Sequence, residues 1–183
     1  MSAFELAALS SAYSVRRLGE DDVETILALC RSNPQYYAYC GKEVSAELIE
    51  QDMAITPPGI PMEQKYYIGF YEGAELAVVM DLIDGYPEED CVFIGFFMLH
   101  GRLQGCGIGS QIVGEVFAYL RKRNMRRCQL GIDKDNPQSN HFWKKNGFAV
   151  IREVERDNWD DPLGGEETLK SNKNPTYELH RSG

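Results

Sequence analysis

A glycine-rich turn stands between a strand-like apolar segment and a helix-like segment, and this order constrains the fold more than any other feature. The turn covers residues 104–109, with glycine at 105, 107 and 109. Residues 92–99 before it have the length of a buried strand, and apolar residues after it recur at helical spacing from 108 to 120. Such a turn places several backbone N–H groups at the N-terminus of a helix. The sequence therefore predicts a phosphate-binding site.

The surroundings of the glycine turn argue against two familiar nucleotide sites but leave alternatives open. No Gly-Lys-Ser/Thr follows the turn, so it is not a P-loop. It also follows an antiparallel meander instead of opening a βαβ unit, which disfavours a nucleotide-binding protein of Rossmann type. A tight turn whose glycines only permit close packing is the structural alternative.

Composition bounds the class of protein. The 183 residues, 43% of them apolar, suit a single domain over 1–183, with residues 1–12 as a short helix or a loose leader. A formal net charge of -9 argues against nucleic-acid binding. No apolar run reaches the roughly 18 residues that span a bilayer. The five scattered cysteines, with no Cys-x-x-Cys pair, favour reduced thiols in the cytoplasm and no metal site.

The order of the segments predicts an α+β fold. Three strands in series, residues 65–71, 76–83 and 92–99, form a meander of hairpins. Further strands are expected at residues 14–18, 128–132, 148–154 and about 176–180, the last after a polar stretch over 155–174. Helices are expected at residues 20–31, 108–120 and 136–146, and one more is capped by Ser45 and ended by residues 56–59. Residues 36–39 are expected to form an aromatic loop.

A second segment, residues 136–148, favours the binding interpretation of the glycine turn over the packing alternative. Together the two segments resemble the GCN5-related N-acetyltransferase (GNAT) superfamily. The phosphate loop of that superfamily has the form Gln/Arg-x-x-Gly-x-Gly/Ala, and its later segment has an Asn, a small residue, an aromatic residue and Gly-Phe at fixed spacing. The matching residues are Gln104, Gly107, Gly109, Asn136, Ser139, Trp143, Gly147 and Phe148.

The resemblance implies an acyl-CoA N-acyltransferase fold, a mixed and mostly antiparallel central sheet flanked by helices, with acetyl-CoA as cosubstrate. The end of the strand before the turn would pair with the pantetheine amides, and Gly95 would mark the bulge that parts the neighbouring strands. Arg102 would reinforce the phosphate end. The expected coenzyme-binding residues are Phe97, Met98, Leu99, Gln104, Gly105, Cys106, Gly107, Ile108, Gly109, Ser110, Asn136 and Trp143. Asn136, followed by proline, is also a natural helix N-cap.

Acyl transfer to an amine needs a base, because an alkyl amine is almost fully protonated at neutral pH. The glutamate that several relatives use lies five residues before the Asn, where this chain has Gly131. The replacement we predict is Asp81, a lone carboxylate in an apolar strand; its structural alternative is a partner for Lys or Arg. Asp133 and His100 are lesser candidates, more typical of turn residues.

The usual acid is also missing, because Trp143 stands where many relatives have tyrosine. Water or one of Tyr36, Tyr37 and Tyr39 would protonate the departing thiolate, and a core cluster is the alternative for these tyrosines. The N–H groups of Met98 and Leu99 are expected to stabilise the oxyanion.

The sequence thus predicts a cytoplasmic N-acetyltransferase, monomeric or homodimeric, that acetylates a primary amine of a small molecule or peptide. It is expected to bind neither nucleic acid nor membranes. A catalytically weak acyl-CoA-binding module is the alternative, because both familiar acid–base residues are absent.

Overall fold

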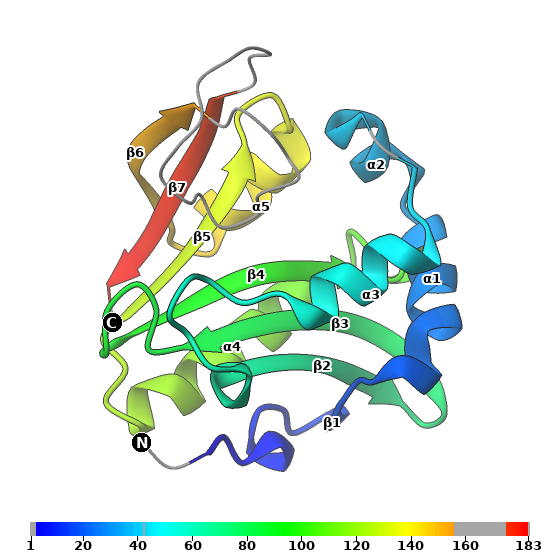
Figure 1. The fold of residues 1–183 in the computed structure, drawn as a ribbon, viewed down its shortest axis with the longest axis horizontal. Helices are drawn as coiled ribbons and strands as arrows, with labels where there is room; N and C mark the ends of the chain where they lie inside the picture. Colours follow the sequence, from blue (N-terminus) through cyan, green and yellow to red (C-terminus); the bar gives the residue numbers. More distant parts are fainter. Residues whose placement is uncertain (1–2, 42, 156–174, 183) are drawn as a thin grey trace.

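The computed structural model describes residues 3–41, 43–155 and 175–182. They form a seven-stranded sheet in the order β1-β2-β3-β4-β5-β7-β6, drawn in Figure 1. Its strands are β1 (Ser14–Arg17), β2 (Lys65–Glu72), β3 (Glu75–Asp84), β4 (Cys91–Leu99), β5 (Arg127–Asp133), β6 (Ala149–Glu155) and β7 (Pro175–Ser182). Only β4 and β5 pair in parallel, and the other neighbours are antiparallel. The predicted mixed, mostly antiparallel sheet is confirmed.

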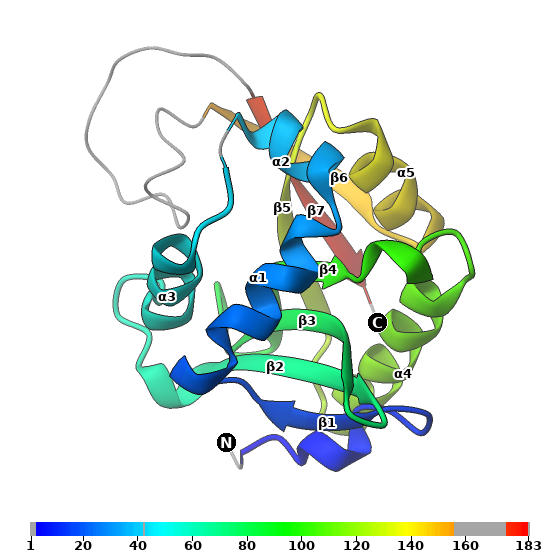
Figure 2. The ribbon, with the colours of Figure 1, turned by 90° about the vertical axis from the view of Figure 1, so that its right-hand side faces the viewer.

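Helices cover both faces of this sheet. The α-helices are α1 (Val23–Arg31), α2 (Pro34–Cys40), α3 (Ala46–Ala54), α4 (Ile108–Lys122) and α5 (Pro137–Lys145), and the short 3₁₀ helices are η1 (Leu6–Ala8), η2 (Glu20–Asp22), η3 (Met62–Gln64) and η4 (Gly101–Leu103). Helices α1 and α3 lie on one face and α4 on the other (Figure 2). Alternate residues of β3 accordingly enter two cores: Met80 packs with the α4 side chains, and Val79 with those of α1 and α3.

A bulge in β4 parts the sheet. Asp81 of β3 lies opposite Phe96 and Leu82 lies opposite Ile94, so Gly95 is the extra residue. Beyond Ile94, β4 no longer pairs with β5, which turns away from it in Figure 1. A Cβ atom at Gly95 would collide with the Asp81 carboxylate, so a larger residue here would require that buried side chain to move. The bulge predicted at this residue is confirmed.

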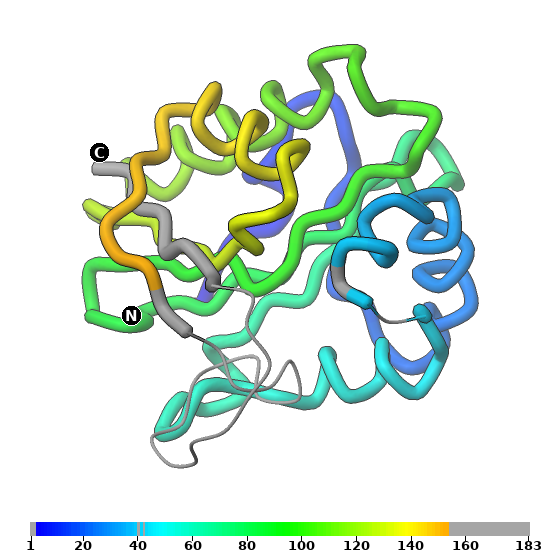
Figure 3. Tube along the Cα trace, turned by 90° about the horizontal axis from the view of Figure 1, so that it is seen from above, coloured from blue at the N-terminus to red at the C-terminus, as the bar shows by residue number. Residues whose placement is uncertain are grey.

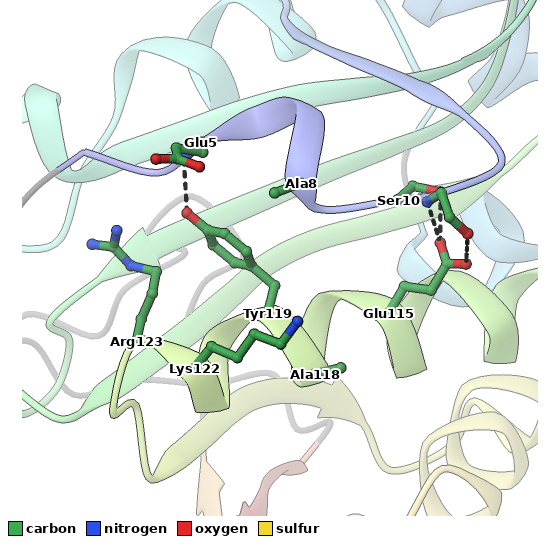
Figure 4. A pocket seen from close by; sticks show the side chains of 9 residues that line it. Glu5, Ala8, Ser10, Glu115, Ala118, Tyr119, Lys122 and Arg123 are labelled. Atoms are coloured by element: carbon green, nitrogen blue, oxygen red, sulfur yellow. Dashed lines mark hydrogen bonds between the residues drawn. The ribbon is translucent and has the colours of Figure 1, made fainter.

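The N-terminal segment, residues 3–12, is packed against the body of the protein, so the loose-leader alternative is wrong for these residues. Phe4 and Leu9 are buried, and the Phe4 ring stacks on Tyr66 with centroids 4.2 Å apart. Ser10 Oγ donates a 2.6 Å hydrogen bond to Glu115 on α4. Figure 4 shows this contact beside a cavity of about 450 Å³ between the segment and α4. Buried apolar side chains hold the segment in place.

The aromatic loop expected at residues 36–39 is wrong, because these residues belong to helix α2. Pro34 occupies the first turn, where its fixed φ suits a helix, and Gly41 ends the helix with a left-handed φ of 65°. The signal lay in these flanking residues and not in any apolar period within the helix. The predicted N-cap Ser45 of α3 is confirmed by the 3.2 Å hydrogen bond that the Leu48 N–H donates to its Oγ. The predicted polar stretch over 155–174 lies, apart from residue 155, outside the described residues.

Candidate functional site

A cleft of about 740 Å³ opens where β4 and β5 diverge. Four segments line it: the α1–α2 junction, the end of β4, the glycine turn before α4, and α5. Figure 3, seen from above, places α2 (light blue) and α5 (yellow) on opposite sides of the green strands. Nine predicted coenzyme-binding residues line the cleft: Phe97, Met98, Leu99, Gln104, Gly105, Gly107, Gly109, Ser110 and Trp143. Three others, Cys106, Ile108 and Asn136, do not.

The glycine turn presents unpaired N–H groups at one end of the cleft. Gly105 and Gly107 have left-handed φ values of 76° and 83°, and α4 begins directly afterwards. Within the described part of the chain, the first helical N–H with a backbone acceptor is that of Gln111, which donates to Gly107 O at 3.0 Å. The N–H groups of residues 105–110 have no such acceptor there. This run at a helix N-terminus suits an anion.

The third glycine of the turn has a packing role as well. A Cβ atom at Gly109 would lie 3.0 Å from the Phe142 ring and 3.3 Å from Leu99 Cδ1. The close-packing alternative therefore holds for Gly109, whereas a Cβ atom at Gly105 or Gly107 would meet nothing within 4 Å. Those two glycines serve the backbone conformation of the turn instead.

The end of β4 offers a free strand edge to the cleft. The N–H of His100 donates to Ala77 O, and hydrogen bonds to β3 alternate along an antiparallel strand, so Met98 also bonds towards β3. Phe97 and Leu99 then direct their backbone groups to the opposite edge, which β5 has left. The Met98 N–H therefore cannot serve as an oxyanion donor in this geometry, and that expectation is wrong. The role of the Leu99 N–H stays a prediction.

The charge of the cleft differs from that of the whole chain. Among the described residues that line it there is no aspartate or glutamate, although the chain has a formal net charge of -9. Lys145 and His141 lie on its α5 side. An anionic ligand would therefore meet free N–H groups and a cation but no carboxylate.

A family model described as "Acetyltransferase (GNAT) family" matches residues 46–148, which include the free edge of β4, the glycine turn and α5. The chain belongs to the GNAT family. No curated protein sequence matches the chain significantly. In this GNAT protein the glycine turn follows the end of β4 closely along the chain, and both line the same cleft.

Solved structures of acetyltransferases share this fold. An acetyltransferase from Thermus thermophilus is 18% identical, with a TM-score of 0.69 and coverage of 93% of this chain and 97% of that one. The PaiA N-acetyltransferase from Thermoplasma acidophilum, solved with coenzyme A, is 15% identical, with a TM-score of 0.61 and coverage of 93% and 99%. The ribosomal-protein-S18-alanine N-acetyltransferase from Escherichia coli is 10% identical, with a TM-score of 0.63 and coverage of 93% of both chains.

Asn136 and Trp143 of this GNAT protein have clear structural roles. Asn136 is buried, and its Oδ1 accepts a 3.0 Å hydrogen bond from the Ser139 N–H, which confirms the predicted helix cap. Its contact with a coenzyme stays a prediction. Trp143 packs against Phe97, with ring centroids 5.4 Å apart, and lines the cleft. An indole thus occupies the place at which the resemblance leads one to expect a tyrosine.

The predicted base Asp81 is buried and paired. Its Oδ2 accepts a 2.7 Å hydrogen bond from Lys65 Nζ, and its Oδ1 is buried without a partner among the described residues. Asp81 does not line the cleft, although its carboxylate lies against the exposed Gly95 at the point where the strands part. The structural alternative, pairing with a cation, is therefore present. The role as base stays a prediction.

The lesser candidates have the geometry of turn residues. Asp133 Oδ1 accepts a 2.9 Å hydrogen bond from the Asp135 N–H, and His100 Nδ1 accepts one of 3.3 Å from the Arg102 N–H. The Arg102 guanidinium pairs with Glu75 and does not line the cleft, so the expected support of the phosphate end is wrong.

The three tyrosines of α2 separate into different environments. Tyr36 lines the cleft, Tyr37 packs into the core between the sheet and α1, and Tyr39 is exposed. Burial raises the pKa of the Tyr37 phenol far above its ordinary value. Tyr36 is thus the member of this set that lines the cleft.

The Asp81 carboxyl should make stability depend on pH. Burial, which outweighs the attraction of Lys65, raises its pKa from 3.8 to about 6. The folded protein therefore keeps a proton that the unfolded chain releases, so this contribution to stability is full below pH 3.8 and is lost as the pH rises to about 6.

We expect the difference in unfolding free energy between the wild type and Asp81→Asn to fall by about 3 kcal/mol over this range. Urea unfolding of both proteins at several pH values measures it. Asp22, whose pKa is lowered by Arg16, gives the opposite trend in both proteins and cancels in the difference. A difference that does not change with pH would show that the Asp81 pKa is normal in the folded state.

Proposed function

We propose that this protein is an acetyl-CoA-dependent N-acetyltransferase that transfers the acetyl group directly to a primary amine. The observation that carries the proposal is the run of free N–H groups at residues 105–110, placed at the end of a cleft with no carboxylate in its described lining, beside the free edge of β4. A coenzyme pyrophosphate suits the turn, and the backbone groups of Phe97 that face the cleft suit a pantetheine amide. This division of roles fits an extended thioester with an anionic end.

The proposed reaction is direct substitution at the thioester carbonyl. The amine nitrogen forms a bond with the carbonyl carbon, the C–S bond breaks, and the proton of the amine passes to a base. The Leu99 N–H is our candidate donor to the oxyanion that develops on the carbonyl oxygen. A coenzyme thiol with a pKa of about 8.5 leaves as a thiolate at a modest cost near neutral pH.

Two residues are our candidates for proton transfer. Asp81 is the candidate base, reached through water near Gly95, because glycine replaces glutamate at position 131. Tyr36 is the candidate acid, because it lines the cleft whereas Tyr37 and Tyr39 do not. We infer that Trp143 packs the cleft wall and does not supply a proton.

The acceptor is proposed only as an amine of a small molecule or peptide. Relatives of the same fold carry names with very different acceptors, such as the Escherichia coli enzyme for the alanine of ribosomal protein S18 and a spermidine N-acetyltransferase chimera. We further infer a cytoplasmic monomer or homodimer that binds neither nucleic acid nor membranes, from the acidic charge and the scattered cysteines. No helix among the described residues is long and apolar enough to cross a bilayer.

A thiol-release assay with acetyl-CoA and a panel of amines tests the proposal. We expect turnover with at least one amine and a loss of about a hundredfold or more in kcat for Asp81→Asn if its carboxylate is the base. Turnover that Asp81→Asn leaves unchanged shows that another group takes the proton. The absence of glutamate at position 131 and of tyrosine at position 143 favours a second candidate, an acyl-CoA-binding module. Tight CoA binding without turnover of any amine would support that candidate.

A further inference from the structure

Asn33 occupies a position that usually caps a helix but does not cap it. It directly precedes Pro34, the first residue of α2, yet its side chain accepts no hydrogen bond from the first turn of that helix. Asparagine at this position ordinarily stabilises a helix by such a bond. The side chain is also buried, with 6% of the residue exposed. A buried amide that forgoes its usual local partner must be held by other groups.

Two of those other groups belong to Leu99 and Gln104, which line the cleft. Asn33 Nδ2 donates a 2.9 Å hydrogen bond to Leu99 O at the end of β4, and a further one of 3.0 Å to Leu29 O at the end of α1. Its Oδ1 accepts a hydrogen bond from Gln104 Nε2, directly before the phosphate turn. Gln104 Oε1 in turn accepts one of 2.9 Å from Gln138 on α5. Gln104 therefore fixes the orientation of the Asn33 amide, with its N–H groups towards Leu99.

The hydrogen bond from Asn33 to Leu99 lies at the edge of β4 that faces the cleft. Leu99 directs both its N–H and its C=O away from β3, towards the edge that β5 has left. No strand of the described chain pairs with this edge at Leu99, so the Asn33 amide takes the place of a sheet partner for the Leu99 carbonyl. The carbonyl oxygen that accepts this hydrogen bond lies close to the Leu99 N–H, which is our candidate donor to the oxyanion.

We propose that Asn33 is a positioning residue for acyl transfer, which holds the backbone of Leu99 through its carbonyl so that the Leu99 N–H faces the thioester oxygen. The inference rests on the proposed function, in that acetyl-CoA must occupy the cleft. Asn33 itself does not touch the reacting atoms. It acts by fixing the backbone of Leu99. Its own hydrogen bond occupies the Leu99 carbonyl oxygen, so that the Leu99 N–H, and not that oxygen, faces the developing negative charge.

Isotope-edited infrared spectroscopy of bound acetyl-CoA tests this without any acceptor amine. Only the acetyl carbonyl carbon is labelled, and the stretching frequency of the thioester carbonyl is compared between the bound and the free state. In the wild type we expect a shift to lower frequency, because the Leu99 N–H polarises the carbonyl. In Asn33→Ala most of this shift should be lost, while the Kd for CoA without an acetyl group changes by less than about threefold.

Asn33→Asp gives a second, nearly isosteric test. Its carboxylate still accepts from Gln104 but cannot donate to Leu99 O, so it should also lose the shift. Ser45→Ala is the control for a loss of stability away from the site, because it removes the N-cap of α3, which does not line the cleft. With an amine that responds in the thiol-release assay, we expect Asn33→Ala to lower kcat about tenfold or more with little change in the KM for acetyl-CoA.

The possible failures are distinguishable. If the wild type does not bind acetyl-CoA, the proposed function itself fails. If the wild type binds it with a shifted carbonyl and both Asn33 variants keep that shift, the positioning role is overturned while the proposed function stands. A shift lost equally in Ser45→Ala would also overturn it, because the effect would then follow from stability alone.

Discussion

Ser110→Asp is expected to lower the affinity of the protein for CoA by more than about a hundredfold without loss of stability. Ser110 lies in the first turn of α4 and lines the cleft beside the free N–H groups. A carboxylate about 5 Å from a phosphate charge costs about 3 kcal/mol at an effective dielectric constant of about 20. The same carboxylate complements the dipole at the N-terminus of a helix, so the melting temperature should stay constant or rise.

Isothermal titration with CoA and a thermal melt of the same samples measure both effects. Ser110→Asn is the control, because it has nearly the same size and polarity without the charge, and it should bind within about fivefold of the wild type. If Ser110→Asp binds CoA as tightly as Ser110→Asn does, the phosphate site is not at this turn.

Lys65→Met is expected to have the largest effect on stability, a loss of about 3–5 kcal/mol at neutral pH. Lys65 and Asp81 are both buried, with 3% and 7% of their side chains exposed, and removal of the cation leaves a carboxylate with no compensating charge. The loss should shrink as the pH falls towards 4, because Asp81 is then protonated in the folded chain and carries no charge to compensate. Urea unfolding at both pH values measures it.

Two further variants make this prediction specific. Lys65→Met/Asp81→Asn should recover most of the lost stability, because no buried charge remains. Lys134→Met removes the lysine of a 2.7 Å ion pair with Glu153 on the surface, and it should cost less than about 1 kcal/mol. Equal losses of stability in Lys65→Met and Lys134→Met would show that breaking the buried pair costs no more than breaking a surface pair.

Local patterns in the sequence predicted the parts of this protein whose partners are close along the chain. The strand–turn–helix around Gly105 and Gly107 and the cap at Asn136 follow from residue types within a few positions, whereas the bulge at Gly95 was expected from the family resemblance. The helix α2 was missed because its tyrosines show no apolar period, although Pro34 and Gly41 bracket it. The backbone conformation of those two residues carried the information.

Contacts between distant residues could not be predicted in the same way. Asn33 meets Leu99 across 66 positions, and nothing near Asn33 distinguishes it from an ordinary helix cap. For Asp81, its apolar neighbours indicated that a cation or a cleft was needed, but not that Lys65 supplies the cation. Whether the Met98 or the Leu99 N–H faces the cleft depends on the hydrogen-bond alternation between β3 and β4, which only the register reveals.

The absence of carboxylates from the described lining of the cleft also governs how a coenzyme would arrive. A triply phosphorylated molecule is repelled by a chain of net charge -9 while it is still distant, and it gains favourable contacts once it reaches the glycine turn and Lys145 in the cleft. Salt at about 0.1 M screens charges beyond about 10 Å, so it weakens the distant repulsion more than the close contacts. The encounter rate would then increase with moderate ionic strength, opposite to the slowing typical of ligands that are steered by attraction.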